Sequence, residues 1–200
     1  MDGRVERGRT TRDRLIATAR DLFGAQGYDA TSIGSILKTA GVARGALYHH
    51  FPTKEALFDA VLDRTVAEIA SSAAKAARAA GDDPVASLRA GFGAWLRLAL
   101  DPGVQRISLV DAPAVVGWTR WRELDERHVL GGVRANLRRI ARDGRLQAAD
   151  IDVLAHMLLA AVNEAALMIA RAEDPAAGLA AGQAAVDALL DSLFDRRPAS

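Results

Sequence analysis

Apolar residues recur along most of the chain at intervals of three and four, which is the period of an amphipathic helix. The pattern is clearest in residues 31–54, TSIGSILKTAGVARGALYHHFPTK. A first short helix is predicted there, and either Thr31 or Ser32 can cap its start with a hydroxyl. Its apolar face consists of Ile33, Ile36, Leu37 and Ala40.

A second short helix follows after a tight turn. Gly41 can take the left-handed conformation that ends a helix, and the next helix is expected to begin near Ala43. Pro52 ends it, because the residue before a proline avoids helical geometry, and Thr53 can cap the following helix. Two short helices joined by a glycine turn predict a helix-turn-helix at about residues 32–51.

The outer face of the second helix carries groups suited to DNA. In this motif the N-terminal residues of the second helix meet base edges in the major groove. Arg44 can read a guanine or reach a phosphate, and Gly45 lets the helix approach the bases closely. Tyr48, His49 and Lys54 are expected on phosphates. The expected DNA contacts are Thr31, Ser32, Arg44, Gly45, Tyr48, His49 and Lys54.

The same residues carry a resemblance to a known family. GYDATS at 27–32, AGV at 40–42 and above all GALYHHFPTKEALF at 45–58 resemble the DNA-binding domain of the TetR family of bacterial transcriptional regulators. The resemblance runs without a gap from about Thr10 to Val61. It implies a three-helix DNA-binding domain, a larger helical domain for ligand binding and dimerisation, and repression relieved by a small molecule.

Composition and charge fit this interpretation. Half of the 200 residues are apolar, which is enough for a sizeable core, and the absence of cysteine excludes disulfides and thiol chemistry. Residues 1–54 hold nine Lys or Arg against five Asp or Glu, whereas residues 55–200 hold seventeen against twenty. A basic N-terminal part on a mildly acidic body is typical of a DNA-reading domain attached to a body that does not bind DNA.

No segment has the pattern of a targeting or membrane sequence. The arginine-rich N-terminus lacks the apolar region of a secretory signal. The most apolar stretch, residues 153–170, is interrupted by His156, Asn163 and Glu164, which argues against a membrane span. A cytoplasmic protein is expected.

Three divisions of the chain are expected. Residues 1–9 form a flexible basic arm, which either contacts phosphate or the minor groove or is a solvated tail. Residues 10–56 form the DNA-binding domain, whose first helix starts at a capping box formed by Thr10 and Asp13. Residues 57–200 form the helical domain for effector binding and dimerisation.

The remaining pattern predicts helices only. A long helix runs from Lys54 to Gly81, and another is expected from 118 to 141, where Gly131 and Gly132 mark a kink or a close approach. Because no segment shows strand alternation, the fold class is all-α with about nine helices. Three helix starts combine a capping aspartate with proline: Asp83-Pro84, Asp101-Pro102 and Asp174-Pro175.

Two features of the body suggest surfaces. The arginines of residues 134–145 fit a solvated face near a helix C-terminus better than a second nucleic-acid site. The last two helices, about 150–171 and 175–194, carry small residues that favour close packing across a two-fold axis, although an intramolecular core is the alternative. The expected dimer contacts are Leu179, Gly182, Val186, Leu189, Leu190 and Leu193.

An effector site is expected between helices of the body, lined by apolar side chains with a few polar anchors. For each candidate the alternative is a core residue with satisfied polar groups, and Arg106 and Asp111 can simply pair with each other. The candidates are Arg106, Asp111, Trp118, Trp121, His156 and Asn163.

The expected function is therefore a homodimeric, sequence-specific DNA-binding repressor, released from a pseudo-palindromic operator by a small-molecule effector. The alternatives are an activator, or an effector-independent DNA-binding protein of the same fold. A helical enzyme is disfavoured, because four scattered histidines without cysteine supply no catalytic or metal set at recognisable spacing. No cofactor or metal is expected.

Overall fold

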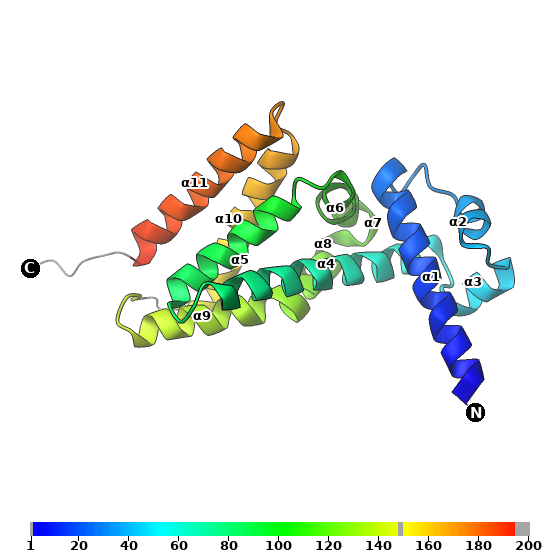
Figure 1. The fold of residues 1–200 in the computed structure, drawn as a ribbon, viewed down its shortest axis with the longest axis horizontal. Coiled ribbons are helices and arrows are strands. Elements are labelled where there is room, and N and C mark those ends of the chain that lie inside the picture. Colours follow the sequence, from blue (N-terminus) through cyan, green and yellow to red (C-terminus); the bar gives the residue numbers. More distant parts are fainter. Residues whose placement is uncertain (1, 148–149, 195–200) are drawn as a thin grey trace, which may run out of the picture. The chain divides into compact units, whose positions relative to one another are not determined.

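The computed structural model describes residues 2–147 and 150–194, with side chains from Arg9 onward, and those residues form helices and turns without strands (Figure 1). Two of the helices contain a π-helical stretch. When each of these two is counted once, the described residues form nine helices, and the all-α prediction is confirmed.

The chain folds into two compact units. The first consists of Met1–Val66 and Pro102–Arg122, and the second of Ala67–Asp101 and Glu123–Ser200. Residues 102–122, which belong to the expected C-terminal domain of residues 57–200, therefore pack with the N-terminal helices.

The first unit contains the predicted helix-turn-helix. Its leading helices are α1 (Asp2–Gln26), α2 (Ile33–Ala40) and α3 (Arg44–His50), followed by the start of α4 (Lys54–Ala79). From the middle of the chain it includes α6 (Pro102–Gln105), η1 (Arg106–Asp111), α7 (Ala112–Val115) and the start of α8 (Gly117–Asp125). In this unit α1 contacts α2, α3, α6 and η1.

The predicted ends of the short helices are confirmed. The Ser32 hydroxyl accepts a hydrogen bond from the Ser35 N–H at 3.0 Å, and Gly41 ends α2 in the left-handed conformation with φ 61°. Helix α3 ends at His50, just before Pro52. The Thr53 hydroxyl accepts from the Ala56 N–H at 3.1 Å and caps α4.

The predicted start of the first helix is wrong. Helix α1 begins at Asp2, eight residues before Thr10, so residues 2–9 continue the helix backwards. Arginine and glutamate are good helix formers, and a hydrophilic segment can extend a helix without an apolar face to reveal it.

The core of the first unit is built from side chains that lie where α1, α2, α3 and α4 meet. Its fully buried members are Leu15, Ala19, Phe23, Ile36, Leu47, Leu57, Phe58, Val61 and Leu62. Gly27 then ends α1 with φ 84°, so the chain turns sharply toward Tyr28.

The second unit is a bundle of long helices. Helices α5 (Pro84–Leu98), α9 (Gly131–Arg142), α10 (Ile151–Ala170) and α11 (Pro175–Phe194) belong to it (Figure 1). The π-helical stretch η2 (Glu126–Leu130) belongs to it as well. Helix α5 packs on α9, α10 and α11, and α10 and α11 lie side by side. Helices α5, α6 and α11 begin at the predicted prolines.

Gly131 and Gly132 were expected to mark a kink or a close approach, and the structure shows neither role for these two residues. Gly131 and Gly132 are exposed, and an added Cβ on either would meet no atom within 4 Å, so no close approach occurs there in the described chain. The irregularity of this helix is η2, the π-helical stretch that ends just before Gly131.

The predicted dimer contact on α11 is wrong for three of its six residues, Gly182, Val186 and Leu190. Val186 is 5% and Leu190 0% exposed, and an added Cβ on Gly182 would lie 3.0 Å from the Ile169 side chain. These three residues therefore pack α11 inside the second unit. Their apolar stripe is what any helix needs to bury its inner face, so periodicity alone does not identify a dimer surface. Leu179, Leu189 and Leu193 are half-buried.

Helix α10 is long and apolar enough to cross a membrane, with a mean hydropathy of 1.8 over 18 residues, 33% of which are buried. Core helices of soluble proteins pass the same test. Asn163, one of the polar residues that interrupt it, is 9% exposed and paired within the protein.

Candidate nucleic-acid interface

Helix α3 has one buried and one exposed face, as predicted. Leu47 is fully buried, and Val42 and Ala46 are half-buried. On the other side Arg44, Gly45, Tyr48 and His49 are exposed, and the Tyr48 side chain is 44% exposed.

Gly45 has no side chain and leaves the backbone bare on this outer face, where an added Cβ would meet nothing within 4 Å. Arg44 stands beside it on the first turn of α3. A guanidinium next to bare backbone has the geometry of a major-groove reader. Residues 10–56, which carry this surface, are called the head below.

The two hydroxyl residues before α2 differ. Ser32 is exposed and caps the helix, so its N-terminus also presents backbone donors at the surface. Thr31, in contrast, is fully buried and its hydroxyl donates to the carbonyl oxygens of Gly27 at 2.8 Å and Leu22 at 3.2 Å. The assignment of Thr31 to DNA is therefore wrong: its side chain fixes the turn after α1.

Lys54 lies on an aromatic ring. Its Nζ is 4.0 Å from the centroid of the Tyr28 ring, at the start of α4. The Tyr28 ring stacks on Phe23 at 5.7 Å and meets Phe58 edge-on at 5.2 Å, so the ring under the lysine is itself packed. The ammonium group of a lysine that is only half-buried, as Lys54 is, can reach a phosphate.

Glu55 completes this arrangement. The Tyr28 hydroxyl donates a hydrogen bond to the Glu55 carboxylate, and burial together with that bond raises the pKa of Tyr28 above its usual range. Hydrogen bonds from its own backbone N–H, from Thr53 and from Tyr28 lower the pKa of Glu55. Near neutral pH the tyrosine is thus a donor and the glutamate an acceptor.

A second cation–aromatic contact was missed by sequence reasoning. The Arg12 guanidinium carbon lies 5.3 Å from the Phe51 ring centroid, and Arg12 is exposed. The available signal was an arginine on the outer side of the first helix and a phenylalanine just after the second helix of the motif. The sequence cannot show that the two meet.

Two candidate effector residues instead contact the head. The Asp111 carboxylate accepts from the Tyr28 N–H at 2.8 Å. An added Cβ on Gly27 would lie 2.9 Å from Arg106 Nη1 and 3.6 Å from the Asp111 carboxylate, so both side chains lie against this turn. Asp111 therefore serves as a backbone anchor for the head.

The other candidates do not form one group either. Trp118 and Trp121 belong to the first unit, with ring centroids 4.8 Å apart, and the Trp121 indole N–H donates to the Ser108 carbonyl at 3.2 Å. In the second unit the buried Asn163 accepts from the Trp95 indole N–H at 2.9 Å. Each therefore has a structural contact within its own unit.

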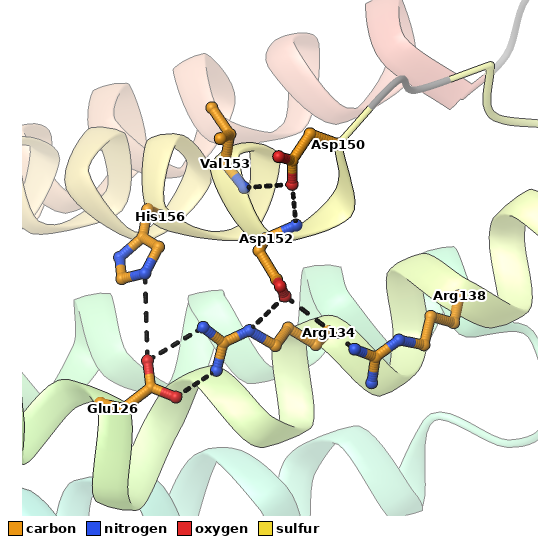
Figure 2. A network of polar contacts seen from close by, with 7 residues as sticks. All are labelled: Glu126, Arg134, Arg138, Asp150, Asp152, Val153 and His156. Atoms are coloured by element: carbon orange, nitrogen blue, oxygen red, sulfur yellow. Dashed lines mark hydrogen bonds and ion pairs between the residues drawn. The ribbon is translucent and has the colours of Figure 1, made fainter.

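His156 belongs to the network of Figure 2, which joins η2, α9 and α10. Arg134 lies 2.5 Å from Glu126 and 2.7 Å from Asp152, and His156 Nε2 lies 3.9 Å from Glu126. Nearby, Arg145 pairs with Asp83 at 2.6 Å. These arginines bind carboxylates of their own unit, which supports the solvated-face interpretation over a second nucleic-acid site.

Comparison with known proteins identifies the family. Residues 15–61 match the family described as bacterial regulatory proteins, tetR family, and residues 85–193 match the tetracyclin repressor-like C-terminal domain. The second match alone covers more than half of the chain. The chain belongs to the TetR family of transcriptional regulators.

Individual known proteins are similar to different lengths of the chain. The crystal structure of a TetR-family transcriptional regulator from Pectobacterium atrosepticum superposes with a TM-score of 0.81 at 36% identity, covering 96% of this chain and 97% of that one. The Transposon Tn10 TetC protein of Escherichia coli is 29% identical over 154 residues, which are 76% of this chain and 77% of that protein. The HTH-type transcriptional regulator UidR of Escherichia coli is 37% identical over 62 residues, 31% of this chain and 32% of that protein.

This family consists of DNA-binding transcriptional regulators and is not a family of enzymes. Within the described residues no group of three or more His, Asp or Glu side chains is arranged to hold a metal ion.

Proposed function

We propose that this TetR-family regulator is a homodimeric, cytoplasmic repressor that binds a pseudo-palindromic operator and is released by a small-molecule effector. The observation that supports it most is the outer face of α3, where Arg44, Gly45, Tyr48 and His49 are exposed over a buried Leu47. Ser32 and Lys54 flank this face with groups suited to phosphates.

The two-fold symmetry of the proposed dimer has a direct consequence. Two recognition helices related by a two-fold axis bind half-sites about one DNA turn apart, roughly 34 Å, or somewhat more. An operator with matching inverted half-sites is therefore expected.

The dimer surface is proposed on the outer faces of α10 and α11. Val153, Met157 and Met168 of α10 are 53%, 63% and 67% exposed, and they follow one another at helical spacing. The outer face of α11 carries exposed alanines, which allow close helix contact: Ala177, Ala181, Ala184 and Ala188. Leu179, Leu189 and Leu193 border the buried stripe and remain in the proposed interface.

The test is binding selection from a random duplex pool with the purified full chain, followed by a salt titration on the selected site. A palindromic sequence with a steep salt dependence supports the proposal. Selection of no sequence, by a protein that is folded and dimeric, contradicts it. An activator and an effector-independent DNA-binding protein are separated from a repressor by transcription from the selected site, with and without candidate effectors.

A further inference from the structure

Lys54 is connected to residues 106–111 through Tyr28. The lysine Nζ lies 4.0 Å above the Tyr28 ring, and the backbone N–H of the same tyrosine donates to Asp111 at 2.8 Å. The Tyr28 side chain therefore contacts Lys54, the expected phosphate-binding lysine, and the Tyr28 backbone contacts Asp111.

The aromatic ring restricts the lysine. A lysine side chain has four rotatable carbons, and ordering it on a phosphate loses conformational entropy. A cation–π contact holds the ammonium near its binding position before DNA arrives. Tyr28 can do this because Phe23 and Phe58 hold its ring, while the Glu55 carboxylate holds its hydroxyl.

The backbone of Tyr28 is fixed from the other side. Gly27 has φ 84°, and Arg106 and Asp111 lie against it, so the turn can neither widen nor move toward η1 freely. Asp111 is the last residue of η1, a π-helical stretch. Each hydrogen bond of such a stretch spans one residue more than in an α-helix, and one residue in an α-helix corresponds to a rotation of about 100°. A change of η1 to α-helical geometry would thus turn Asp111 away from the Tyr28 N–H.

We propose that Tyr28 is a positioning residue for the Lys54 phosphate contact and that Asp111 holds Tyr28 in place, so that residues 106–111 set the affinity of the head for DNA. The proposal rests on the DNA-binding function proposed above. It gives the mid-chain segment a route to the DNA surface that lies wholly within the first unit.

The first experiment measures DNA affinity against salt on the selected operator and on an unrelated duplex. Lys54→Gln should lower affinity on both by about sixtyfold at 0.1 M salt and reduce the salt slope by about two, as expected for one lost phosphate contact in each of the two subunits of the bound dimer. Tyr28→Leu should give the same loss, and the double variant should lose no more than either single one. Tyr28→Phe keeps the ring and is the matched control, with affinity close to that of the wild type.

The Asp111 variants follow the same logic. Asp111→Ala removes the acceptor for the Tyr28 N–H, and its affinity should fall between those of the wild type and Lys54→Gln. Asp111→Asn keeps an oxygen at that position and should bind like the wild type. A folded Tyr28→Leu with the wild-type salt slope, or losses that add in the double variant, would overturn the proposal.

A second measurement does not require DNA or the Tyr28→Leu variant. The chain has three lysines, Lys38, Lys54 and Lys75, so reductive ¹³C-methylation gives few signals and keeps the charges. The Lys54 methyl signal, assigned by its loss in Lys54→Arg, should be shifted upfield by the tyrosine ring relative to the other two. Asp111→Ala should reduce this shift.

The outcomes separate the two proposals. A Lys54 signal that coincides with those of Lys38 and Lys75 overturns the positioning role, whatever the DNA results. A wild-type protein that selects no DNA overturns the proposed function, even if the ring-current shift is present.

Discussion

Arg44 stands exposed on the first turn of α3, next to the bare backbone of Gly45. A guanidinium in that position can donate two hydrogen bonds to one guanine, and a bidentate contact of this kind discriminates between bases by about 1–3 kcal/mol. Its contribution should therefore be specific to one base pair of each half-site.

Arg44→Ala should weaken operator binding by about 1–3 kcal/mol for each half-site and relax the preference at that base pair. Competition binding against operators mutated one position at a time measures both effects. Arg78→Ala, which removes an exposed arginine from the far end of α4, is the control and should bind normally. Unchanged affinity and preference in Arg44→Ala would mean that another residue reads the bases.

Asn163 shows how a polar residue can suggest a ligand site and be part of the core instead. Its amide oxygen accepts from the Trp95 indole N–H at 2.9 Å, and both side chains are buried. Asn163→Ala should destabilise the protein by about 1–3 kcal/mol, because it leaves a buried donor without a partner. Urea unfolding measures the change. Replacing both partners by Asn163→Leu and Trp95→Phe should lower stability less than Asn163→Ala if the unpaired donor is the cause.

At the scale of single helices, the sequence predicts starts and ends well where a side chain marks them. Ser32, Thr53 and Asp83 cap their helices as expected, because each accepts a hydrogen bond from the backbone N–H three residues later. Such contacts are local, so sequence order alone places them. The start of α1 carries no comparable mark, and the prediction missed it by eight residues.

Contacts between distant residues were beyond sequence reasoning. The apolar stripe of α11 predicted a helix correctly but did not reveal whether Val186 and Leu190 face a second chain or α10 and α5. Likewise, the outer face of α3 followed from helical spacing, whereas the pairing of Asp111 with Tyr28 joins residues 83 positions apart. The π-helical stretches are not marked by the helical spacing of apolar residues or by capping residues.

The network of Figure 2 makes the stability of the second unit depend on pH. The hydrogen bond from Arg134 lowers the pKa of Glu126 below its ordinary value. A carboxyl group with a lowered folded-state pKa stabilises the fold above its unfolded-state pKa of about 4.3, and this contribution is lost as the pH falls through the folded-state pKa.

Glu126→Gln should therefore be less stable than the wild type at pH 7, and the difference should shrink as the pH falls below about 4.3. Denaturant unfolding of both proteins at pH 7 and at low pH measures it. Glu173→Gln removes an exposed glutamate from the turn after α10 and should behave like the wild type at both. An equal difference between Glu126→Gln and the wild type at the two pH values would exclude a role for this ionisation.

At the scale of the whole molecule, the two units carry different surfaces. The head presents the exposed Lys38 and Arg44 on α2 and α3, backbone donors at the N-terminus of α2, and the half-buried Lys54 at the start of α4. The second unit presents exposed methionines on α10 and exposed alanines on α11. Exposed apolar side chains of this kind are typical of a surface that packs against another protein. This contrast is expected of a protein that binds DNA with one part and a second copy of itself with the other.

The dimer surface can be tested without disturbing the core. Met157 and Met168 are 63% and 67% exposed, so the double variant Met157→Asp, Met168→Asp should leave the subunit folded. In the dimer it would bury unpaired carboxylates, at a penalty of several kcal/mol for each. Sedimentation velocity should show monomers, and operator affinity should fall steeply because the two half-sites are no longer bound together.

The double variant Met157→Leu, Met168→Leu is the control, which keeps the surface apolar and should remain dimeric. If the aspartate variant stays dimeric with a wild-type unfolding curve, the dimer contact lies elsewhere on the molecule.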